Sequence, residues 1–204
     1  MPESDLRSCW EDRILQIMTA DHYLTNQFLI AMPTLADANF SQTVTLICEH
    51  NAQGALGLII NRPMRMKLNE VFEQLELGST PDALNDQLIL QGGPVQPDRG
   101  FVIHRAGANW ESTVKVSNQI HVTTSRDILN AVAAGQGPEP ICMVLGYAGW
   151  EAGQLEAEVS QNSWLTVPVD ERILFSTPYE QRWMAAAQLL GVNLNTLSPH
   201  AGHA

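Results

Sequence analysis

Three segments rich in glycine and polar residues follow apolar runs in this sequence, and each has the composition of a binding loop. The first is Asn61-Arg62-Pro63, directly after the apolar run 55–60. An amide beside a guanidinium at the end of a strand is suited to bind carboxylates, phosphates or backbone groups. The same residues also suit a simple turn, with Asn61 as its cap and Pro63 restraining its backbone.

The other two segments are defined by their glycines. Paired glycines allow close backbone approach and let N–H groups face an anion, although they are equally typical of a tight turn. In 146–156 we predict a glycine-rich turn that leads from a strand into the N-terminus of a helix, and Trp150 in it either stacks on a ligand or fills the core. The candidate residues of these two segments are Gly92, Gly93, Pro94, Gly146, Gly149, Trp150, Gly153 and Gln154.

Histidines are the remaining candidates for chemistry. An enzyme of hydrolase or transferase type would use His104 or His50 as a base near Arg62, and this alternative stays open. Glu49 and His50 are adjacent in a predicted strand, so their side chains point to opposite faces and do not form a natural acid–base pair. The sequence lacks GxSxG, GxxxxGK[ST], GxGxxG and HExxH motifs. We therefore predict no catalytic residue.

No metal site or cofactor is predicted either. The cysteines are Cys9, Cys48 and Cys142, and no CxxC pair occurs among them. His200 and His203 have HxxH spacing, but they lie in a tail without nearby carboxylates or thiolates, so we expect no metal there.

The charge of the chain restricts its partners. The formal net charge is −11, and the densest basic cluster is Arg62, Arg65 and Lys67. Binding to a phosphate backbone needs a basic face, so direct DNA binding is disfavoured, although a dimer that pairs two such clusters stays open. No apolar stretch approaches the roughly 18 residues of a membrane span, and the polar N-terminus does not resemble a signal peptide. We expect a cytoplasmic protein without a membrane partner.

The periodicity of apolar residues predicts the elements that position these candidates. Strands are expected at 28–32, 43–48, 55–60, 87–91, 101–104, 120–124, 140–145, 164–167 and 173–175, with a hairpin loop at 51–54. Helices are expected at 68–77 with Gly78 after its end, at 126–134 between Ser125 and Gly135, at 152–159 and at 179–190. Hairpins mixed with βα units favour an α+β fold with mixed, largely antiparallel sheets and several flanking helices. We expect residues 1–17 to be an extension, either non-native or flexible, and 18–204 to form one domain.

Several long segments resemble a known family. They are FLIAMPTLADANFSQTVTLICEHNAQGALGLIINRP, QGGPVQPDRGFVIH, LGYAGWEAGQLEAEVSQNSWL and the terminal GHA. Together they are similar to the YqgE/AlgH family of small bacterial proteins, over about 24–204. The resemblance implies a cytoplasmic α+β fold without an established activity, catalytic residue or cofactor. It also implies a candidate role in transcriptional regulation, because one member is linked to control of alginate production.

The residues and the resemblance together favour a non-catalytic regulatory or binding module. We expect the Asn61-Arg62 segment, the Gly92-Gly93 segment and the Trp150 segment to converge at one edge of a sheet. Their partner would be a protein or a small anionic ligand. The sequence leaves its identity and the oligomeric state open.

Overall fold

The computed structural model describes residues 23–78, 81–192 and 194. The predicted extension at 1–17 and the histidines of the tail lie outside this described part. The strands are β1 (Gln27–Ala31), β2 (Val44–Asn51), β3 (Gly54–Ile59), β4 (Pro63–Lys67), β5 (Leu88–Gln91), β6 (Val95–Arg105), β7 (Thr113–Lys115), β8 (Ile120–Thr123), β9 (Ile141–Glu151) and β10 (Trp164–Pro168). The helices are α2 (Leu68–Gln74), α3 (Arg126–Ala133), α4 (Gln154–Ser160), α5 (Glu171–Phe175) and α6 (Arg182–Gln188), with the short 3₁₀ turns η1 (Asp82–Leu84) and η2 (Tyr179–Gln181).

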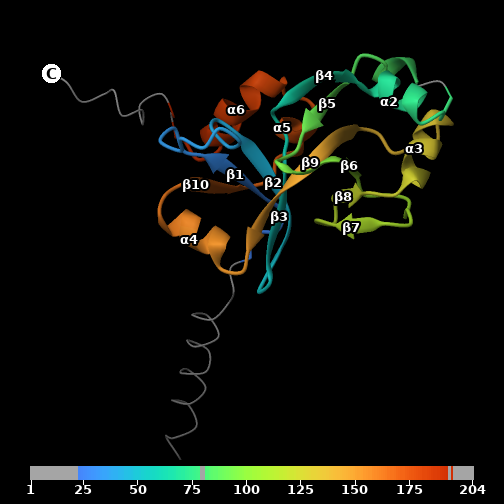
Figure 1. Ribbon diagram of the computed structural model, residues 1–204. Coiled ribbons are helices and arrows are strands. Elements are labelled where there is room, and N and C mark those ends of the chain that lie inside the picture. Colours follow the sequence, from blue (N-terminus) through green and yellow to red (C-terminus); the bar gives the residue numbers. More distant parts are fainter. Residues whose placement is uncertain (1–22, 79–80, 193, 195–204) are drawn as a thin grey trace, which may run out of the picture.

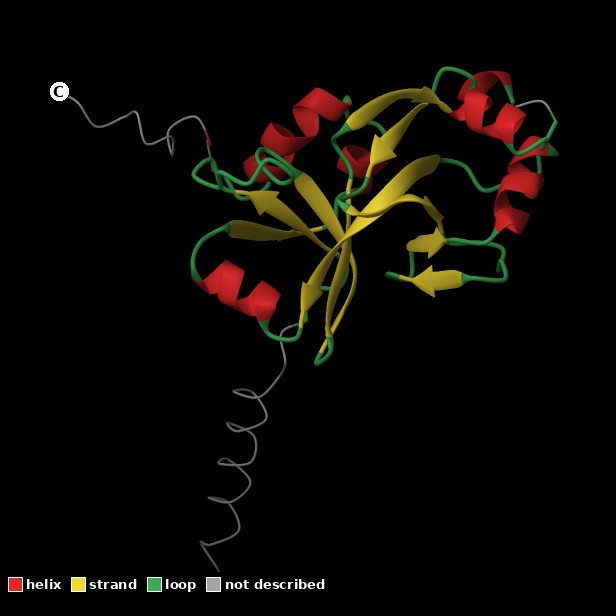
Figure 2. Cartoon of the chain, viewed as in Figure 1, coloured by secondary structure: helices red, strands yellow, loops and turns green. Residues whose placement is uncertain are grey.

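The strands form one branched sheet with the helices around it (Figures 1 and 2). Its main path runs β10-β1-β2-β3-β9-β6-β8-β7, while β5 joins β9 and carries β4 beside it. The β5–β9 pair is parallel, and every other pair is antiparallel. This topology confirms the predicted α+β class with mixed, largely antiparallel strands.

Strand β9 joins the two halves of the sheet. Its first half pairs with β5 and β6, and its second half pairs with β3 from Ala148 to Glu151. Gly146 lies between the two halves with a φ of +74°. A residue with a Cβ atom rarely adopts this conformation, so glycine lets one strand change partners without leaving the sheet.

Alternation along β1 places neighbouring residues in two different cores. Phe28 and Ile30 pack with α5 and α6 on one face of the sheet, whereas Leu29 and Ala31 pack with Leu155 of α4 on the other face. This is the period-2 geometry of a strand that is buried on both faces. The layers are visible in Figure 1, where α4 lies apart from α5 and α6.

A third core lies under α2 and α3, beyond β5 and β6. Val71 and Phe72 of α2 and Ile128 and Leu129 of α3 pack on the apolar residues of β5, β6 and β9. Figure 2 shows these two helices together at the far end of the sheet from α4. In the described part of the chain, no helix is both long and apolar enough to cross a lipid bilayer.

Several local predictions are confirmed. The hairpin between β2 and β3 turns at 51–54, with Asn51 paired to Gly54. Helix α3 begins after Ser125 and ends before Gly135, which has a φ of +68°. Both ends follow the usual preference for serine before a helix and glycine after it.

Three local predictions are wrong. The stretch 146–151 belongs to β9 rather than to a turn, because Tyr147 pairs with β6 and 148–151 pair with β3. The run 173–175 lies in α5, since the Asp170 side chain accepts a hydrogen bond from Ile173 N and caps a helix there. Helix α2 ends before Glu76, which has a φ of +54°, so Gly78 does not follow its last turn.

Candidate functional site

The first predicted segment connects β3 to β4 and is held by its own polar side chains. Asn61 Oδ1 accepts a hydrogen bond from Val44 N at 2.9 Å, and Asn61 Nδ2 donates to Gln42 O at 2.8 Å. Arg62 Nη2 donates to Ser41 O at 3.2 Å, and burial lowers the pKa of its guanidinium while Asp37 partly opposes this effect. Pro63 is the first residue of β4. Asn61 and Arg62 therefore fasten the end of β3 to the segment before β2.

In the second segment, the backbone of Gly92 and Gly93 lies directly against the backbone of β9. Gly92 N donates to Leu145 O at 2.7 Å, and Gly92 O accepts from Ile59 N at 2.9 Å. A Cβ atom on Gly92 would lie 2.3 Å from Gly146 O, and one on Gly93 would lie 2.2 Å from the carbonyl carbon of Tyr147. Pro94 follows at the exposed end of this crossing. The backbone groups of Gly92 are used inside the sheet, so they do not form an anion site.

The third segment is divided between two places. Gly146 lies at the crossing with Gly93, but Gly149 and Trp150 belong to the part of β9 that pairs with β3. Trp150 is four positions after Gly146 along the strand, about 13 Å away at the usual rise per residue. The predicted convergence of all three segments is therefore corrected: the Asn61-Arg62 and Gly92-Gly93 segments meet beside Gly146, and Trp150 lies elsewhere. Arg62 O accepts a hydrogen bond from Gln91 N at 2.8 Å at this meeting point.

Trp150 fills the core beneath α4. Its side chain is 6% exposed, and its ring lies 6.1 Å from that of Trp164, centroid to centroid. Trp150 Nε1 donates to Glu158 Oε2, while Gln154 Nε2 donates to Glu158 Oε1. Gly153 precedes the helix in a left-handed conformation. Of the two predicted roles for Trp150, the structure has the packing role.

Both candidate histidine bases are buried and have both ring nitrogens occupied. His104 Nδ1 lies 2.8 Å from Arg105 O and must donate to it, so Nε2 accepts from the Thr123 hydroxyl at 2.9 Å. Burial lowers the pKa of His104; the hydrogen bond to Arg105 opposes this shift, and His121 adds to it. His50 Nδ1 accepts from Leu24 N at 2.9 Å, and its Nε2 lies 3.0 Å from Glu156 Oε1. None of these hydrogen bonds involves Arg62.

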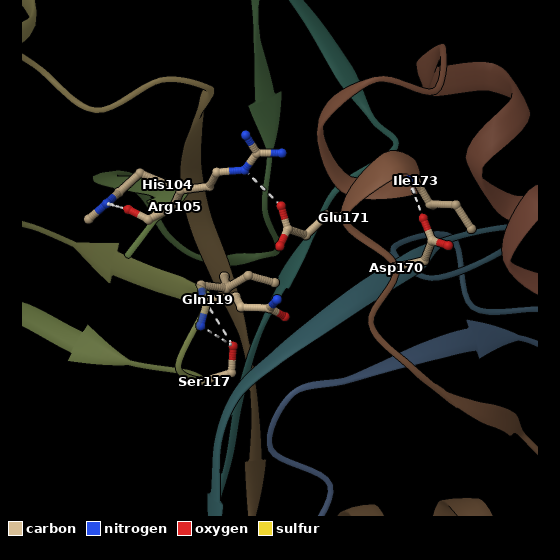
Figure 3. Close-up of polar contacts among 8 residues, drawn as sticks. His104, Arg105, Ser117, Gln119, Asp170, Glu171 and Ile173 are labelled. Atoms are coloured by element: carbon tan, nitrogen blue, oxygen red, sulfur yellow. Dashed lines mark hydrogen bonds and ion pairs between the residues drawn. The ribbon is translucent and has the colours of Figure 1, made fainter. Parts of the chain in front are cut away.

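His104 and Thr123 have the spacing of a general base and a hydroxyl nucleophile, but a substrate cannot reach them. Each residue is 0% exposed. The Thr123 hydroxyl also lies 2.8 Å from that of Thr113, so it is enclosed by protein partners. The neighbouring Arg105 extends away from the pair, and its Nε donates to Glu171 at the start of α5 (Figure 3).

A cleft that the sequence does not predict lies between α2, α3 and the sheet, and we call it the α2–α3 cleft. It encloses about 430 Å³. Its apolar wall consists of Met66, Val71, Leu75, Val102, Leu129, Met143 and Leu145, and Gly100 and Thr123 complete the lining. Its polar rim consists of Gln74, Asp98, Thr124, Ser125 and Arg126. The cleft combines a continuous apolar wall with a small set of polar groups, the usual composition of a ligand site.

The local sequence explains how this wall forms. Val71 lies on α2, and Leu75, one helical turn later, is the residue that directly follows the helix. Met143 and Leu145 share one face of β9 because they are two residues apart. Gly100 leaves open the space that a side chain would occupy, since a Cβ atom there would lie 3.5 Å from Met143 Cε. Arg126 Nη2 donates to Leu75 O and so joins the first turn of α3 to the end of α2. In the sequence, these apolar residues carry the same signal as core residues.

Comparisons with known proteins identify the family. A family model described as AlgH-like matches residues 28–195. The chain belongs to the AlgH-like family. The AlgH protein of Pseudomonas aeruginosa is 56% identical to it over 183 residues, which cover 89% of this chain and 96% of that protein. A relative from Thioalkalivibrio sulfidiphilus is 53% identical over 187 residues, which cover 92% of this chain and 100% of the relative.

Solved structures agree with this AlgH-like assignment. The solution structure of Pseudomonas aeruginosa AlgH is 54% identical, has a TM-score of 0.73, and matches 91% of this chain and 98% of that one. A crystal structure from Corynebacterium diphtheriae has a TM-score of 0.70 over 91% of this chain and 97% of that one. It is 16% identical, so it supports the fold alone. The names of these relatives state no enzymatic activity.

The two thiols that the structure describes in this AlgH-like chain are not placed for nucleophilic chemistry. Cys48 and Cys142 are free and buried, at 3% and 2% exposure. Burial raises the pKa of Cys142 to about 11 and raises that of Cys48 as well. A thiol must lose its proton to attack or to bind a metal, so both are held in the unreactive form. Among the residues that the structure describes, no three His, Cys, Asp or Glu side chains gather to hold a metal ion.

Proposed function

We propose that this AlgH-like chain is a non-catalytic, cytoplasmic regulatory module that binds a small amphipathic molecule in the α2–α3 cleft. The observation that carries the proposal is the cleft itself, with seven apolar side chains beneath a rim of five polar ones. Its volume of about 430 Å³ lies within the range of ligand sites, roughly 300–1,000 Å³. The regulatory part of the proposal rests on the resemblance to a family with one member linked to control of alginate production.

Charge favours this cleft over the other hollows of the described surface. A second hollow, of about 380 Å³, is bordered by Glu49, Glu111 and Arg99, and a third, of about 660 Å³, is bordered by Asp86, Glu139 and Arg105. Each has two acidic groups for one basic group. The α2–α3 cleft has one of each, Asp98 and Arg126. In a chain with a net charge of −11, it is the least negative of the three.

The described histidines and cysteines that an enzyme would use as base or nucleophile are not available for chemistry, which favours a binding role. His50 and His104 are buried with both ring nitrogens occupied, and the two described cysteines are protonated and buried. The charge of the chain supports regulation through a ligand or a protein rather than through direct contact with DNA.

The test is a cleft-filling substitution measured with a defined apolar probe. A side chain at Gly100 would point toward Met143 and Leu145, so Gly100→Leu is expected to occupy the cleft. Gly107→Leu is the matched control, because nothing lies within 4 Å of a Cβ atom at Gly107. Binding of 1-anilinonaphthalene-8-sulfonate is measured by calorimetry after circular dichroism shows that all three proteins are folded.

The expected result is one saturable site per chain, weakened about tenfold or more by Gly100→Leu and unchanged by Gly107→Leu. The proposal is wrong if folded wild type shows no saturable site. It is also wrong if folded Gly100→Leu binds the probe as tightly as wild type.

A further inference from the structure

We infer that the molecule held in the α2–α3 cleft has an aliphatic body and an anionic head group, and that Arg126 binds the head. This inference rests on the proposed function and names the chemical class of its ligand. Three features of the described residues support it: the side chains of the wall, the geometry of Arg126 and the arrangement of donors along the rim.

The wall of the cleft fits an aliphatic chain. It is built from leucine, valine and methionine, and no aromatic side chain lines it. Planar ligands are usually held by stacking on aromatic rings, which this wall does not offer. Met66 and Met143 have unbranched thioether side chains that adapt to an apolar surface of irregular shape. An extended alkyl chain makes use of such a surface along its whole length.

The guanidinium of Arg126 is positioned at the mouth of the cleft before any ligand binds. Its Nη2 donates to Leu75 O, the carbonyl of the residue after α2, which holds the side chain across the gap between the two helices. Within the described residues, its Nε and Nη1 have no protein partner. A guanidinium that is already oriented loses little freedom when it binds a carboxylate, sulfate or phosphate through two N–H groups.

The rim offers polar donors besides Arg126. Thr124 lies two residues before Arg126, and its hydroxyl makes no hydrogen bond within the described residues. Ser125 is already used, since its hydroxyl donates to Asp127, and Asp127 also accepts from the N–H of Ile128 in the first turn of α3. The donors that remain for a head group are therefore the Thr124 hydroxyl, the Arg126 guanidinium and the side-chain amide of Gln74, which has no partner among the described residues.

Asp98 is the one carboxylate among the lining residues, and it opposes an anionic head only weakly. It is exposed on β6 and has no hydrogen-bonding partner in the described part of the chain. Water around an exposed charge screens it, so the repulsion from Asp98 is weaker than that from a buried carboxylate. A head group that contacts Arg126 directly keeps its attraction at short range.

The experiment compares two amphiphiles that share a tail and differ in charge. Octyl sulfate and octyltrimethylammonium are titrated by calorimetry, as monomers at low salt, into wild type, Arg126→Gln and Arg65→Gln. Arg65 is exposed on β4 and does not line the cleft, so it supplies the matched control. Gly100→Leu reports whether any heat comes from the cleft. Vesicles of anionic phospholipid form a separate arm, because the same head-group chemistry occurs on a membrane surface.

The expected result is that octyl sulfate binds at least about tenfold more tightly than octyltrimethylammonium, and that Arg126→Gln removes most of this preference while Arg65→Gln retains it. If both amphiphiles bind equally and Gly100→Leu abolishes both, the head-group inference is overturned and the proposed function stands. If neither binds in a manner sensitive to Gly100→Leu, the proposed function fails as well. Binding to the vesicles without binding to octyl sulfate would overturn the assignment to a free amphiphile.

Discussion

The carboxylate of Glu158 accepts a hydrogen bond from the indole of Trp150, with 2.9 Å between Oε2 and Nε1. The same oxygen accepts from Trp164 Nε1 at 2.8 Å. Both indoles are buried, so one side chain of α4 satisfies two donors from β9 and β10 that water does not reach. Helix α4 is thereby fixed to the sheet by polar contacts as well as by apolar packing.

Replacing Glu158 with alanine is expected to lower the free energy of unfolding by about 2–4 kcal/mol, because two buried N–H groups lose their partner. Glu158→Gln keeps an acceptor oxygen and is expected to cost less than half as much. Urea denaturation followed by tryptophan fluorescence measures both variants. Glu73→Ala, at an exposed position of α2, controls for loss of a helical glutamate. Equal stability of Glu158→Ala and Glu73→Ala would contradict the assignment.

The crossing of Gly92 with β9 predicts a strong steric effect. A Cβ atom at Gly92 would lie 2.3 Å from both Gly146 O and Val144 Cγ1, so the two strands would have to separate. Gly92→Ala is expected to destabilise the chain by about 3 kcal/mol or more, in the range of severe core defects. Gly107→Ala meets no atom within 4 Å and is expected to be nearly neutral. Thermal unfolding compares the two, and a neutral Gly92→Ala would show that the crossing is looser than described.

The contacts of Arg182 predict that lysine in its place, at the start of α6, lowers the stability of the fold. It is 3% exposed, its Nε donates to Thr177 O at 2.9 Å, and its Nη1 donates to Ile60 O at 2.5 Å. Lysine cannot reach both carbonyls in this geometry, so Arg182→Lys is expected to cost about 2–3 kcal/mol. Arg172→Lys, at an exposed position of α5, should change stability by less than about 0.5 kcal/mol. Urea midpoints of the two variants give the comparison, and similar midpoints would refute it.

His104 predicts a loss of stability in mild acid. Burial holds its pKa below the usual value, so the unfolded chain takes up this proton at a higher pH than the folded chain. The stability that neutral His104 contributes is therefore complete above about pH 6.5, and it is lost as the pH falls through the lowered folded value. At its steepest, the loss is about 1 kcal/mol per pH unit for one proton.

Urea denaturation between about pH 7.5 and pH 5 measures this dependence. His104→Gln removes the titrating group and is expected to give a flatter profile than wild type over the same range. The carboxylates titrate in both proteins, so the difference between the two profiles isolates His104. Parallel profiles would show that His104 is as easily protonated in the folded chain as in the unfolded one.

Predictions that depended on neighbours in the sequence were confirmed, and those that failed did so for identifiable reasons. Ser125 and Gly135 bound α3 as expected, because the signals for a helix end lie in the few residues around it, although the Ser125 hydroxyl donates to Asp127 and makes no cap hydrogen bond. The sequence predicts a turn from Gly146 because glycine commonly allows one. Here the positive φ of Gly146 lets β9 exchange β5 for β3 and continue as a strand. Asp170 caps the start of α5. The short apolar run 173–175 after it has the pattern of a strand, so the cap alone did not indicate a helix.

The sequence by itself determined the α+β class, most strands and helices, and the family, because these depend on the order and periodicity of residues along the chain. Only the tertiary structure decided that Trp150 packs beneath α4, that Gly92 meets Gly146, and that a cleft separates α2 from α3. An apolar residue in a core and one that lines a cleft have the same local pattern. What distinguishes them is the distance to residues far away in the chain, and packing alone sets that distance.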